Sequence, residues 1–589
     1  MLVRSGVRAL RARVGMRAVR AVRTAHTASD ADVVIVGGGV VGLAMLAGLV
    51  TNRAMPSMRV ALVDAMDLSR FATWRDAKAA TTRAPTPQHD GIAWENRVIS
   101  MNMDNLAWMQ GAYAATHAEL GADAYLDAAR MRNVERIRVW DGLSDAAAEF
   151  GPGAPPSGAL SVMVEIANVQ QALYRLIEAR AADPACRVRV EILGETRVGA
   201  IEAPDRDAWP TVSLEDARGA RQIRTRLLVG ADGHNSPVRR FAGIESFGWP
   251  YDRKGLVATM RTGRAAHSAE PCVDASAWQR FLPTGTLACL PLSASAGTIV
   301  WTLPPALADA LGALHRADAA HSDEPALLAA LITAGFRLPW APLEALLHRA
   351  EALARTDAPD TSALHAAVVE ALAHAEQALG GAAPSAHLGT VPPAGDAVDV
   401  RSVASFPLQL KHAGCYLGST LNRRLHDGLL PAPSTLLTGV LTALQLTPGG
   451  AARGAGQART VLVGDAAHTT HPLSGQGLNL GIQDVRALSG ALADAAQQGL
   501  DLGTDAALRP YEAARYVPNQ AMLSLTDHLH WLFAPRPASA VAPAPGAAGA
   551  VREAALRALV WARSTGLDVV NELGPLKQLL VQGAGSRRA

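Results

Sequence analysis

Cysteine is scarce in this sequence, with four residues among 589. They lie far apart, and no two of them form a CxxC pair; they are Cys186, Cys272, Cys289 and Cys415. This spacing argues against a disulfide framework and against a zinc site, so we expect no bound metal. It fits a reducing compartment.

Acidic residues are absent from the first 29 positions, where seven arginines are separated mainly by valine, alanine and leucine. This composition predicts a mitochondrial transit peptide over 1–29, with a disordered basic arm as the alternative. Without those seven arginines, 48 basic residues face 53 acidic ones, a net charge of about −5 instead of +2. The body of the chain has no basic excess, so we expect no nucleic-acid partner.

One uncharged run approaches the length of a membrane span. It covers the eighteen residues from Val33 to Val50, which is near the lower limit for crossing a bilayer. Three successive glycines at 37–39 interrupt it, and glycine is costly inside a helix. The run predicts a buried strand, a tight turn and a helix, so we expect no transmembrane segment.

The same run begins a pattern that is typical of dinucleotide-binding βαβ units. Its parts are a β-branched strand at 32–36, a G-x-G-x-x-G turn at 37–42, a helix at 43–50, and a second strand at 59–63 that ends at Asp64. Asp64 falls 22 residues after the last glycine of the turn, at the spacing expected for an acidic residue that binds ribose. The pattern predicts a nucleotide site but does not distinguish NAD from FAD.

Each position of this turn has a physical role. Gly37 permits the sharp turn, Gly39 lets the backbone approach a pyrophosphate, and Gly42 lets the helix pack closely on the strands. The helix N-terminus offers free N–H groups and a positive dipole to the phosphates. Asp64 can accept hydrogen bonds from a ribose diol.

Two later segments end a hydrophobic strand in an aspartate and then start a helix. The first spans 227–239 and contains Asp232 and Gly233, with Ser236 placed to cap the helix. The second spans 460–481, where Asp465 precedes a glycine-rich helix start. Together with the first turn, these segments resemble the three FAD fingerprints of the class A flavin monooxygenases.

This resemblance implies an α/β (α+β) fold. A discontinuous Rossmann-like FAD-binding domain of the p-hydroxybenzoate hydroxylase type would be joined to an antiparallel-sheet substrate domain and C-terminal helices. FAD would be the cofactor, with its ribityl hydroxyls held by Asp465.

The resemblance also assigns roles to other residues of the second and third segments. Backbone N–H groups around Gly475, Gln476 and Gly477 would face the flavin N1 and C2 carbonyl, where the helix dipole stabilises the reduced anion. Asp232 and Gly233 would support the pyrophosphate region.

Histidine and serine residues in the third segment could suggest other chemistry. His468 and His471 stand three residues apart, but no cysteine or carboxylate cluster accompanies them, so we expect packed, hydrogen-bonded histidines. Ser474 does not match G-x-S-x-G and is not expected to be a nucleophile.

Segments outside the fingerprints are similar to the ubiquinone-biosynthesis hydroxylases. They lie at 96–98, 165–174, 249–252, 277–285, 406–408 and 511–527. The stretch at 277–285, AWQRFLPTG, is similar to the mitochondrial branch that hydroxylates C5 of a polyprenylated 4-hydroxybenzoate. At Arg253 relatives usually have glutamine, so the role of that side chain stays open.

This closer resemblance implies a reaction and its partners. A prenylated phenol would be hydroxylated with O2 through a flavin C4a-hydroperoxide, with electrons from a ferredoxin and its reductase. The enzyme would work with other ubiquinone-biosynthesis proteins, bound peripherally to the matrix side of the mitochondrial inner membrane. The alternatives are another ring position, another prenylated phenol, or a non-catalytic subunit that binds prenyl lipids.

Eight residues are candidates for the substrate pocket. They are Asn96, Arg97, Tyr251, Trp278, Arg280, Phe281, Pro472 and Leu473. For each aromatic residue, simple core packing is an equally good interpretation.

The domain boundaries follow from these segments. We expect the FAD-binding domain at 30–95, 160–245 and 458–510, and the substrate domain at 96–159 and 246–430. An Ala-rich insertion at about 306–400, a loop at 431–457 and a Pro/Ala-rich insertion at 534–550 within the C-terminal region 511–589 are predicted to be surface elaborations.

Overall fold

The computed structural model describes residues 29–82, 91–114, 126–144, 146–151, 158–205, 207–262, 275–322, 324–357, 359–378, 391–418, 457–472, 475–533 and 560. The predicted transit peptide, nearly all of the loop at 431–457, the insertion at 534–550 and Leu473 lie outside these residues.

A seven-stranded sheet carries the predicted nucleotide-binding motifs, in the order β8-β2-β1-β11-β10-β9 with β18 beside β11. The strands are β1 (Ser29–Val36), β2 (Met58–Val63), β8 (Val188–Leu193), β9 (Arg197–Glu202), β10 (Thr211–Asp216), β11 (Gly219–Gly230) and β18 (Thr460–Leu462). β1 pairs in parallel with β2 and β11, and β11 pairs in parallel with β18. Three strands that each lead into a predicted motif therefore end at the same edge of one sheet.

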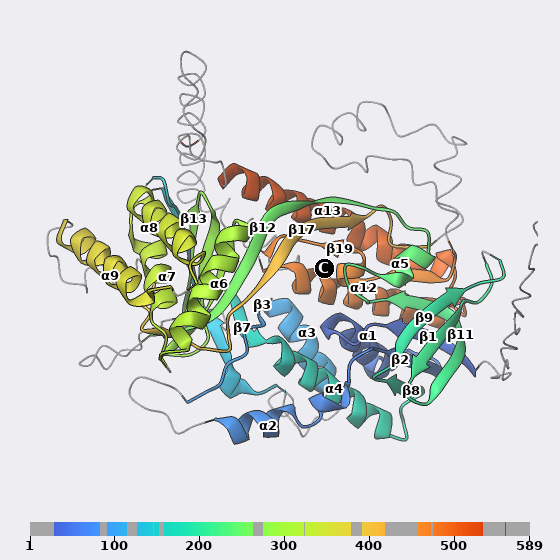
Figure 1. Ribbon diagram of the computed structural model, residues 1–589. Helices are drawn as coiled ribbons and strands as arrows, with labels where there is room; N and C mark the ends of the chain where they lie inside the picture. The colour runs from blue at the N-terminus through green and yellow to red at the C-terminus, as the bar shows by residue number, and fades with distance from the viewer. Residues whose placement is uncertain are drawn as a thin grey trace, which may run out of the picture.

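A nine-stranded sheet forms the second part, in the order β19-β17-β12-β15-β14-β13-β5-β6 with β16 beside β12. The strands are β5 (Arg136–Asp141), β6 (Ala147–Phe150), β12 (Ser246–Arg261), β13 (Ser276–Leu282), β14 (Gly285–Pro291), β15 (Ala296–Leu303), β16 (Ala397–Val398), β17 (Ala404–Ala413) and β19 (His468–Thr469). Its pairs are antiparallel except for β13 with β5. The predicted antiparallel substrate sheet is present. β12 and β17 are its long strands, and they extend towards the seven-stranded sheet (Figure 1).

A small third sheet, β3-β7-β4, links the two parts. It consists of β3 (Val98–Asn102), β4 (Met131–Val134) and β7 (Ser161–Glu165).

Seven α-helices of the described residues lie outside the Ala-rich insertion and pack on the sheets or on one another. They are α1 (Val40–Thr51), α2 (Trp74–Thr81), α3 (Met103–Ala114), α4 (Ile166–Ala182), α5 (Pro237–Phe241), α12 (Gly477–Gln497) and α13 (Asp505–Phe533). α1 packs against α4 and α12, and its Leu43, Met45, Leu46 and Leu49 are fully buried. The run from Val33 to Val50 is thus the predicted strand, turn and helix. No helix in the described part of the chain has the length and hydropathy needed to cross a bilayer.

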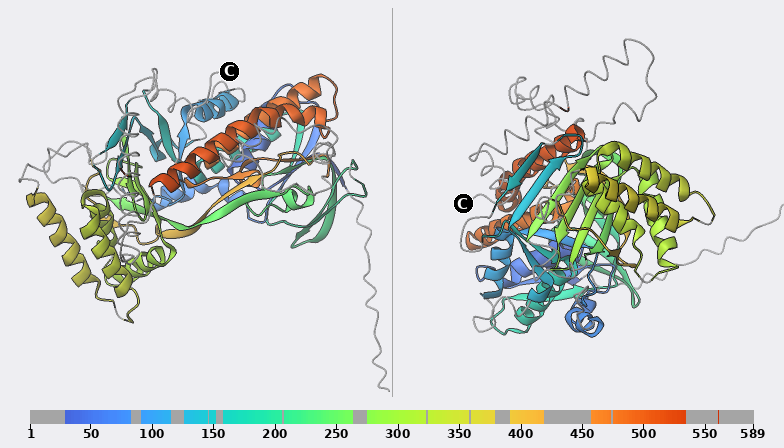
Figure 2. Two further views of the ribbon diagram at one scale, coloured as in Figure 1. Left: turned by 90° about the horizontal axis from the view of Figure 1, so that it is seen from above. Right: turned by 90° about the vertical axis from the view of Figure 1, so that its left-hand side faces the viewer.

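Helices from the Ala-rich insertion form a packed layer on the nine-stranded sheet (Figure 2). They are α6 (Pro305–Ala319), α7 (Leu327–Arg337), α8 (Trp340–Leu353) and α9 (Thr361–Ala378). Every residue of α7 from Leu327 to Phe336 is buried, and Leu331 shares a hydrophobic core with Trp301 of β15. The prediction that this insertion is a surface elaboration was wrong, because its leucines supply one side of the core.

Candidate functional site

The backbone of the first motif approaches neighbouring backbone closely. Gly37 has φ +105°, and a Cβ there would lie 2.3 Å from the carbonyl oxygen of Ala231. A Cβ on Gly42 would lie 1.8 Å from the carbonyl oxygen of Gly37, so both positions require glycine. Around Gly39, by contrast, a Cβ would meet nothing within 4 Å. The turn is crowded on the protein side and open in front of α1.

The N-terminus of α1 is arranged to receive an anion. Gly39 is its N-cap, no side chain caps it, and its first turn contains no acidic residue. Asp64 lies next to this terminus because its Oδ2 accepts a hydrogen bond from Gly38 N at 2.5 Å. Free N–H groups at a helix N-terminus bind phosphate, and a neighbouring carboxylate can bind sugar hydroxyls.

The second motif is joined to the third by Arg239. Ser236 caps α5 as expected, accepting a bond from Arg239 N at 2.8 Å. The Arg239 guanidinium donates to the carbonyl oxygens of His234 and Ala466, each at 2.7 Å. Asp232 accepts from Val238 N through Oδ2, while its buried Oδ1 has no partner among the described residues. An unsatisfied buried oxygen of this kind is costly unless a ligand group reaches it.

Asp465 lies in a recess of the third motif. Its side chain is accessible to solvent, yet so much protein surrounds it that burial raises its pKa, although the charges of His468, His234 and Arg97 lower it. No donor of the described residues forms a hydrogen bond to this carboxylate. Arg97 is therefore near Asp465, although 368 residues separate them in the sequence.

The helix start of the third motif is tied to β3. Asn479 Oδ1 accepts from Asn102 N at 3.0 Å, and Asn479 Nδ2 donates to Ser100 O at 2.8 Å. Gly475 has φ +61°, and Gln476 is the N-cap of α12 without a side-chain cap. The N–H groups near Gly475, Gln476 and Gly477 thus lie beside the strand that follows Arg97.

A buried network behind the third motif was not predicted. Asp484 accepts hydrogen bonds from His468 Nε2 at 2.6 Å, Arg515 Nε at 3.0 Å, Asn519 Nδ2 at 2.9 Å and Gly464 N at 3.1 Å. Burial raises the pKa of this carboxyl, but these cations and donors prevail and hold it below its ordinary value. His468 is thus a hydrogen-bonded core residue, as expected. The residues of this network come from different elements, so their spacing in the sequence carries no signal for it.

A second buried pair, also missed, holds the segment before β3. The Arg130 guanidinium donates to both oxygens of Glu165, at 2.6 Å each, and also to Ala93 O at 2.9 Å. Glu165 in turn accepts from Glu95 N at 2.7 Å. Ile166 N bonds to Arg97 O at 2.9 Å, so this segment is fixed at three points. The orientation of the Arg97 region depends on this pair.

Tyr251 and the residues around it form an aromatic cluster under the end of α13. The Tyr251 ring lies 4.8 Å from the His471 ring and 4.6 Å from the His530 ring, centroid to centroid. Its hydroxyl donates to Asp527 Oδ1 at 2.7 Å, and burial together with Asp527 raises the pKa of Tyr251. Pro472 follows His471 directly, so two pocket candidates meet here.

The histidines of this cluster are neutral near pH 7. Burial and the neighbouring His530 lower the pKa of His471 to about 3. Burial and the charge of Arg253 lower the pKa of His530 to about 4.

The three candidates on β13 do not face the same way. Phe281 stacks on Phe533 of α13, with ring centroids 3.9 Å apart. Trp278 belongs to the core that contains the insertion helices, and Arg280 donates to the carbonyl oxygens of Gly335 and Leu338 at the end of α7. Side chains alternate along a strand. Trp278 and Arg280 thus pack on the helical layer, and only Phe281 reaches the side where Tyr251 and α13 lie.

Asn96 and Arg253 are engaged with backbone. Asn96 Nδ2 donates to Ser402 O at 3.0 Å, and Arg253 Nε donates to Thr284 O at 3.1 Å. Arg253 follows Asp252, whose φ of +50° is unusual for a non-glycine residue, at a register shift between β12 and β17. Bulges of this kind are common beside active sites.

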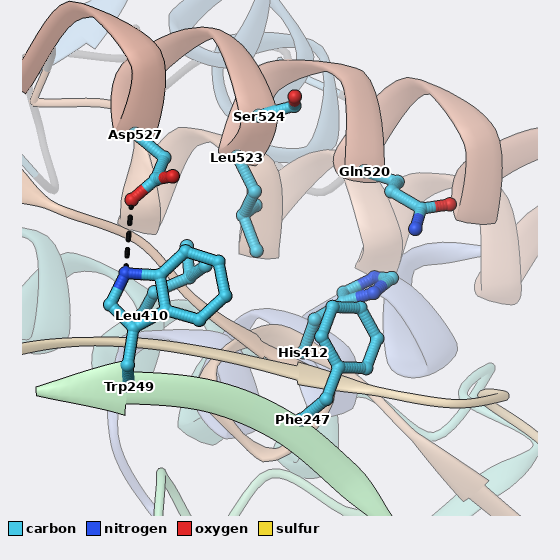
Figure 3. Close-up of a pocket in the computed structure, with 8 residues that line it drawn as sticks. All are labelled: Phe247, Trp249, Leu410, His412, Gln520, Leu523, Ser524 and Asp527. Carbon is cyan, nitrogen blue, oxygen red and sulfur yellow. Dashed lines mark hydrogen bonds between the residues drawn. The ribbon is translucent and has the colours of Figure 1, made fainter. Parts of the chain in front are cut away.

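A small pocket lies between the two long strands and α13 (Figure 3). Its lining residues come from β12, β17 and α13: Phe247, Trp249, Leu410, His412, Gln520, Leu523, Ser524 and Asp527. Trp249 Nε1 donates to the Asp527 oxygen that also receives the Tyr251 hydroxyl. This pocket adjoins the aromatic cluster and is separate from Asp465.

Comparison with known proteins fits this geometry. A family model described as FAD binding domain matches residues 159–309 and 451–525. The ubiquinone biosynthesis monooxygenase COQ6, mitochondrial, of Saccharomyces cerevisiae is 29% identical over 573 residues, covering 96% of each chain. The human protein of that name is 28% identical and covers 95% of this chain and 93% of its own. The chain is an FAD-dependent aromatic monooxygenase.

Solved structures support the fold of this monooxygenase. The p-nitrophenol 4-monooxygenase PnpA of Pseudomonas putida DLL-E4 is 14% identical, with a TM-score of 0.51, and covers 95% of this chain and 100% of that one. The residues present fit FAD. Open space stands before Gly39, a buried oxygen of Asp232 lacks a partner among the described residues, and Asp465 has no donor there.

Proposed function

We propose that this monooxygenase hydroxylates the C5 ring position of a polyprenyl-4-hydroxybenzoate-type precursor in ubiquinone biosynthesis. The observation that carries the proposal is the similarity, over 96% of both chains, to a monooxygenase named for ubiquinone biosynthesis. The overall reaction would take the aromatic C–H, O2, two electrons and two protons to the phenol and water. Bound FAD would supply the oxygen activation.

The chain's own residues would bind the cofactor and shelter the ring. Asp465 would accept ribityl hydroxyls, Asp232 and the N-terminus of α1 would support the pyrophosphate, and Asp64 would bind ribose. The N–H groups at Gly475, Gln476 and Gly477 would face the isoalloxazine edge. Arg97 lies near enough to offset negative charge there.

Tyr251, Phe281, His471 and Pro472 would form the wall that excludes water from the ring. Tyr251 would not act as a base, because its raised pKa keeps the hydroxyl protonated and its proton is already donated to Asp527. His471 is neutral near pH 7, so this wall adds no positive charge. A neutral, packed wall suits a reaction that depends on orientation and exclusion of water.

The setting is part of the same proposal. Electrons would come from a ferredoxin and its reductase, and other ubiquinone-biosynthesis proteins would be partners. The protein would be peripheral on the matrix side of the mitochondrial inner membrane, after removal of a transit peptide.

Mass spectrometry of quinone intermediates in cells lacking this protein tests the ring position. We expect a precursor without the C5 hydroxyl to accumulate, and quinone to return when a ring analogue already bearing that hydroxyl is supplied. Accumulation of a precursor that lacks a different hydroxyl would move the assignment to another ring position. Unchanged quinone would point to another prenylated phenol.

A non-catalytic subunit that binds prenyl lipids is the alternative from another class. The open carboxylate of Asp465 favours a bound flavin over this alternative. Purified protein should carry yellow flavin that reacts with O2 after reduction. Folded protein without flavin would favour the binding subunit.

A further inference from the structure

The two faces of α13 differ in chemistry. The inner face is buried and holds Tyr511, Asn519, Leu523, Asp527, His530 and Phe533. The outer face is exposed and holds Ala513, Ala514, Val517, Pro518, Ala521, Leu525, His528 and Trp531. These outer positions recur every three or four residues, so they form one continuous stripe along the helix. The stripe contains no Asp, Glu, Lys or Arg.

The exposure of this outer stripe is large. Val517 is 68% exposed, Leu525 43% and Trp531 53%, so α13 carries three of the seven large exposed hydrophobic residues in the described part of the chain. Single exposed hydrophobics are common on soluble proteins, but a contiguous stripe indicates a contact surface.

Two carboxylates of α13 are turned away from the outer stripe, and the third, Asp505, is the first residue of the helix, before the stripe begins. Asp527 is buried under the helix, and Glu512 accepts a hydrogen bond from Tyr416 N at 2.7 Å. Arg515 is turned inward, where it donates to Asp484 and Asn519, and Arg509 is exposed near the start of the helix. A helix face that exposes no carboxylate and has an exposed arginine near one end is compatible with an anionic bilayer.

The C-terminal end of the outer stripe lies beside the aromatic cluster. The Trp531 ring is 6.1 Å from the Tyr251 ring, and Phe533 stacks on Phe281 two residues further along. Figure 2 shows α13 running along the outside of the molecule. Residues 513–531 span about 27 Å at 1.5 Å per residue, long enough to lie flat on a membrane surface.

We propose, building on the proposed function, that the outer stripe of α13 docks this protein on a lipid bilayer and places the aromatic cluster at the membrane surface. Trp531 would sit at the interface, where tryptophan is favoured. A prenyl tail would then need to pass only the end of α13 to bring its ring to Tyr251. The bilayer is favoured over a protein partner because the eight residues of the stripe include no charged side chain for specific pairing, and His528 is the one polar residue among them.

Vesicle flotation of the full-length, flavin-loaded protein tests this surface. The probe is vesicles of phosphatidylcholine mixed with cardiolipin, and the variant is Val517→Asp with Leu525→Asp. We expect its vesicle-bound fraction to fall on the order of tenfold, because two apolar contacts become charges at the interface. The matched control, Val369→Asp with Phe406→Asp, changes residues that are 48% and 41% exposed elsewhere and should float like wild type.

Several outcomes would overturn the bilayer assignment. They are equal flotation of both variants, no flotation of wild type, and flotation lost only when 534–589 are removed. A wild-type dimer in solution that the Val517/Leu525 variant abolishes would assign the stripe to a second copy. Flotation needs no substrate, so normal flotation without C5 hydroxylation would refute the proposed function and leave the docking surface standing. Flavin content measured on every variant reports whether it has folded.

Discussion

Asp465 and Asp484 are two carboxylates of the third motif that respond to burial in opposite ways. Protein surrounds both, but Asp465 has no donor among the described residues and its pKa is raised by burial. Asp484 accepts four hydrogen bonds, and its pKa is lowered despite burial. One carboxylate is satisfied by the fold, while the other is accessible to solvent and receives no hydrogen bond from the described residues, so a ligand can reach it.

This difference separates structural from ligand-binding acids without reference to any relative. A buried carboxylate that the fold satisfies adds to the stability of the protein alone, whereas one that is open to solvent adds stability chiefly when a ligand binds it. The two residues should therefore differ in what their removal does to the flavin-free protein.

Replacement of Asp484 should have the largest effect. Asp484→Ala leaves His468 and Arg515 buried without their acceptor, so we expect the free energy of unfolding to fall by about 3–5 kcal/mol. Thermal and urea denaturation of the flavin-free protein measure it. Asp494→Ala, at an exposed position of the same helix, is the matched control and should change little. A loss below about 1 kcal/mol for Asp484→Ala would contradict the structural assignment.

Replacement of Asp465 should act on FAD instead. Two charge-assisted hydrogen bonds to ribityl hydroxyls, at about 1.5 kcal/mol each, correspond to roughly 100-fold in the FAD dissociation constant of Asp465→Ala. The flavin-free variant should be about as stable as wild type, because the described residues make no hydrogen bond to this solvent-accessible carboxylate that the substitution would remove. Titration with FAD and denaturation without it measure the two quantities. Unchanged FAD affinity would show that this recess does not hold the ribityl chain.

The sequence could predict the features whose residues are close together in the chain. The strand, glycine turn, helix and Asp64 are neighbours in the sequence, and so is the cap of Ser236, so local spacing was enough to place them. The Asp484 network and the Arg130–Glu165 pair bring together residues from different elements, and spacing carries no signal for such contacts.

The orientation of side chains on β13 and the packing of the insertion could not be predicted, for a related reason. The sequence shows that side chains alternate along β13. Which of its two faces meets Tyr251 and α13 depends on the neighbouring strands. The leucines of α7 are surrounded by alanines that suggest an exposed helix. Only the position of the sheet beneath shows that every residue from Leu327 to Phe336 is buried.

The smallest predicted effect is on the pH dependence of stability, and it comes from a buried histidine. His530 has its pKa lowered to about 4 by burial and by Arg253, against 6.5 ordinarily. Between pH 6.5 and pH 4, His530 is therefore protonated in the unfolded chain but neutral in the folded protein. The free energy of unfolding falls as the pH decreases through this range. His530→Gln should reduce this loss by about 1–2 kcal/mol at pH 5, at 1.36 kcal/mol per pH unit.

Denaturation of His530→Gln at pH 7 and at pH 5 measures this loss. His374→Gln on α9, an exposed position, serves as the control and should keep the wild-type difference between the two pH values. If His530→Gln kept it too, His530 would already be protonated in the folded protein, and the wall beside Tyr251 would carry a positive charge at pH 5. The aromatic cluster would then have to tolerate a cation near the ring, which the neutral-wall account of water exclusion does not allow.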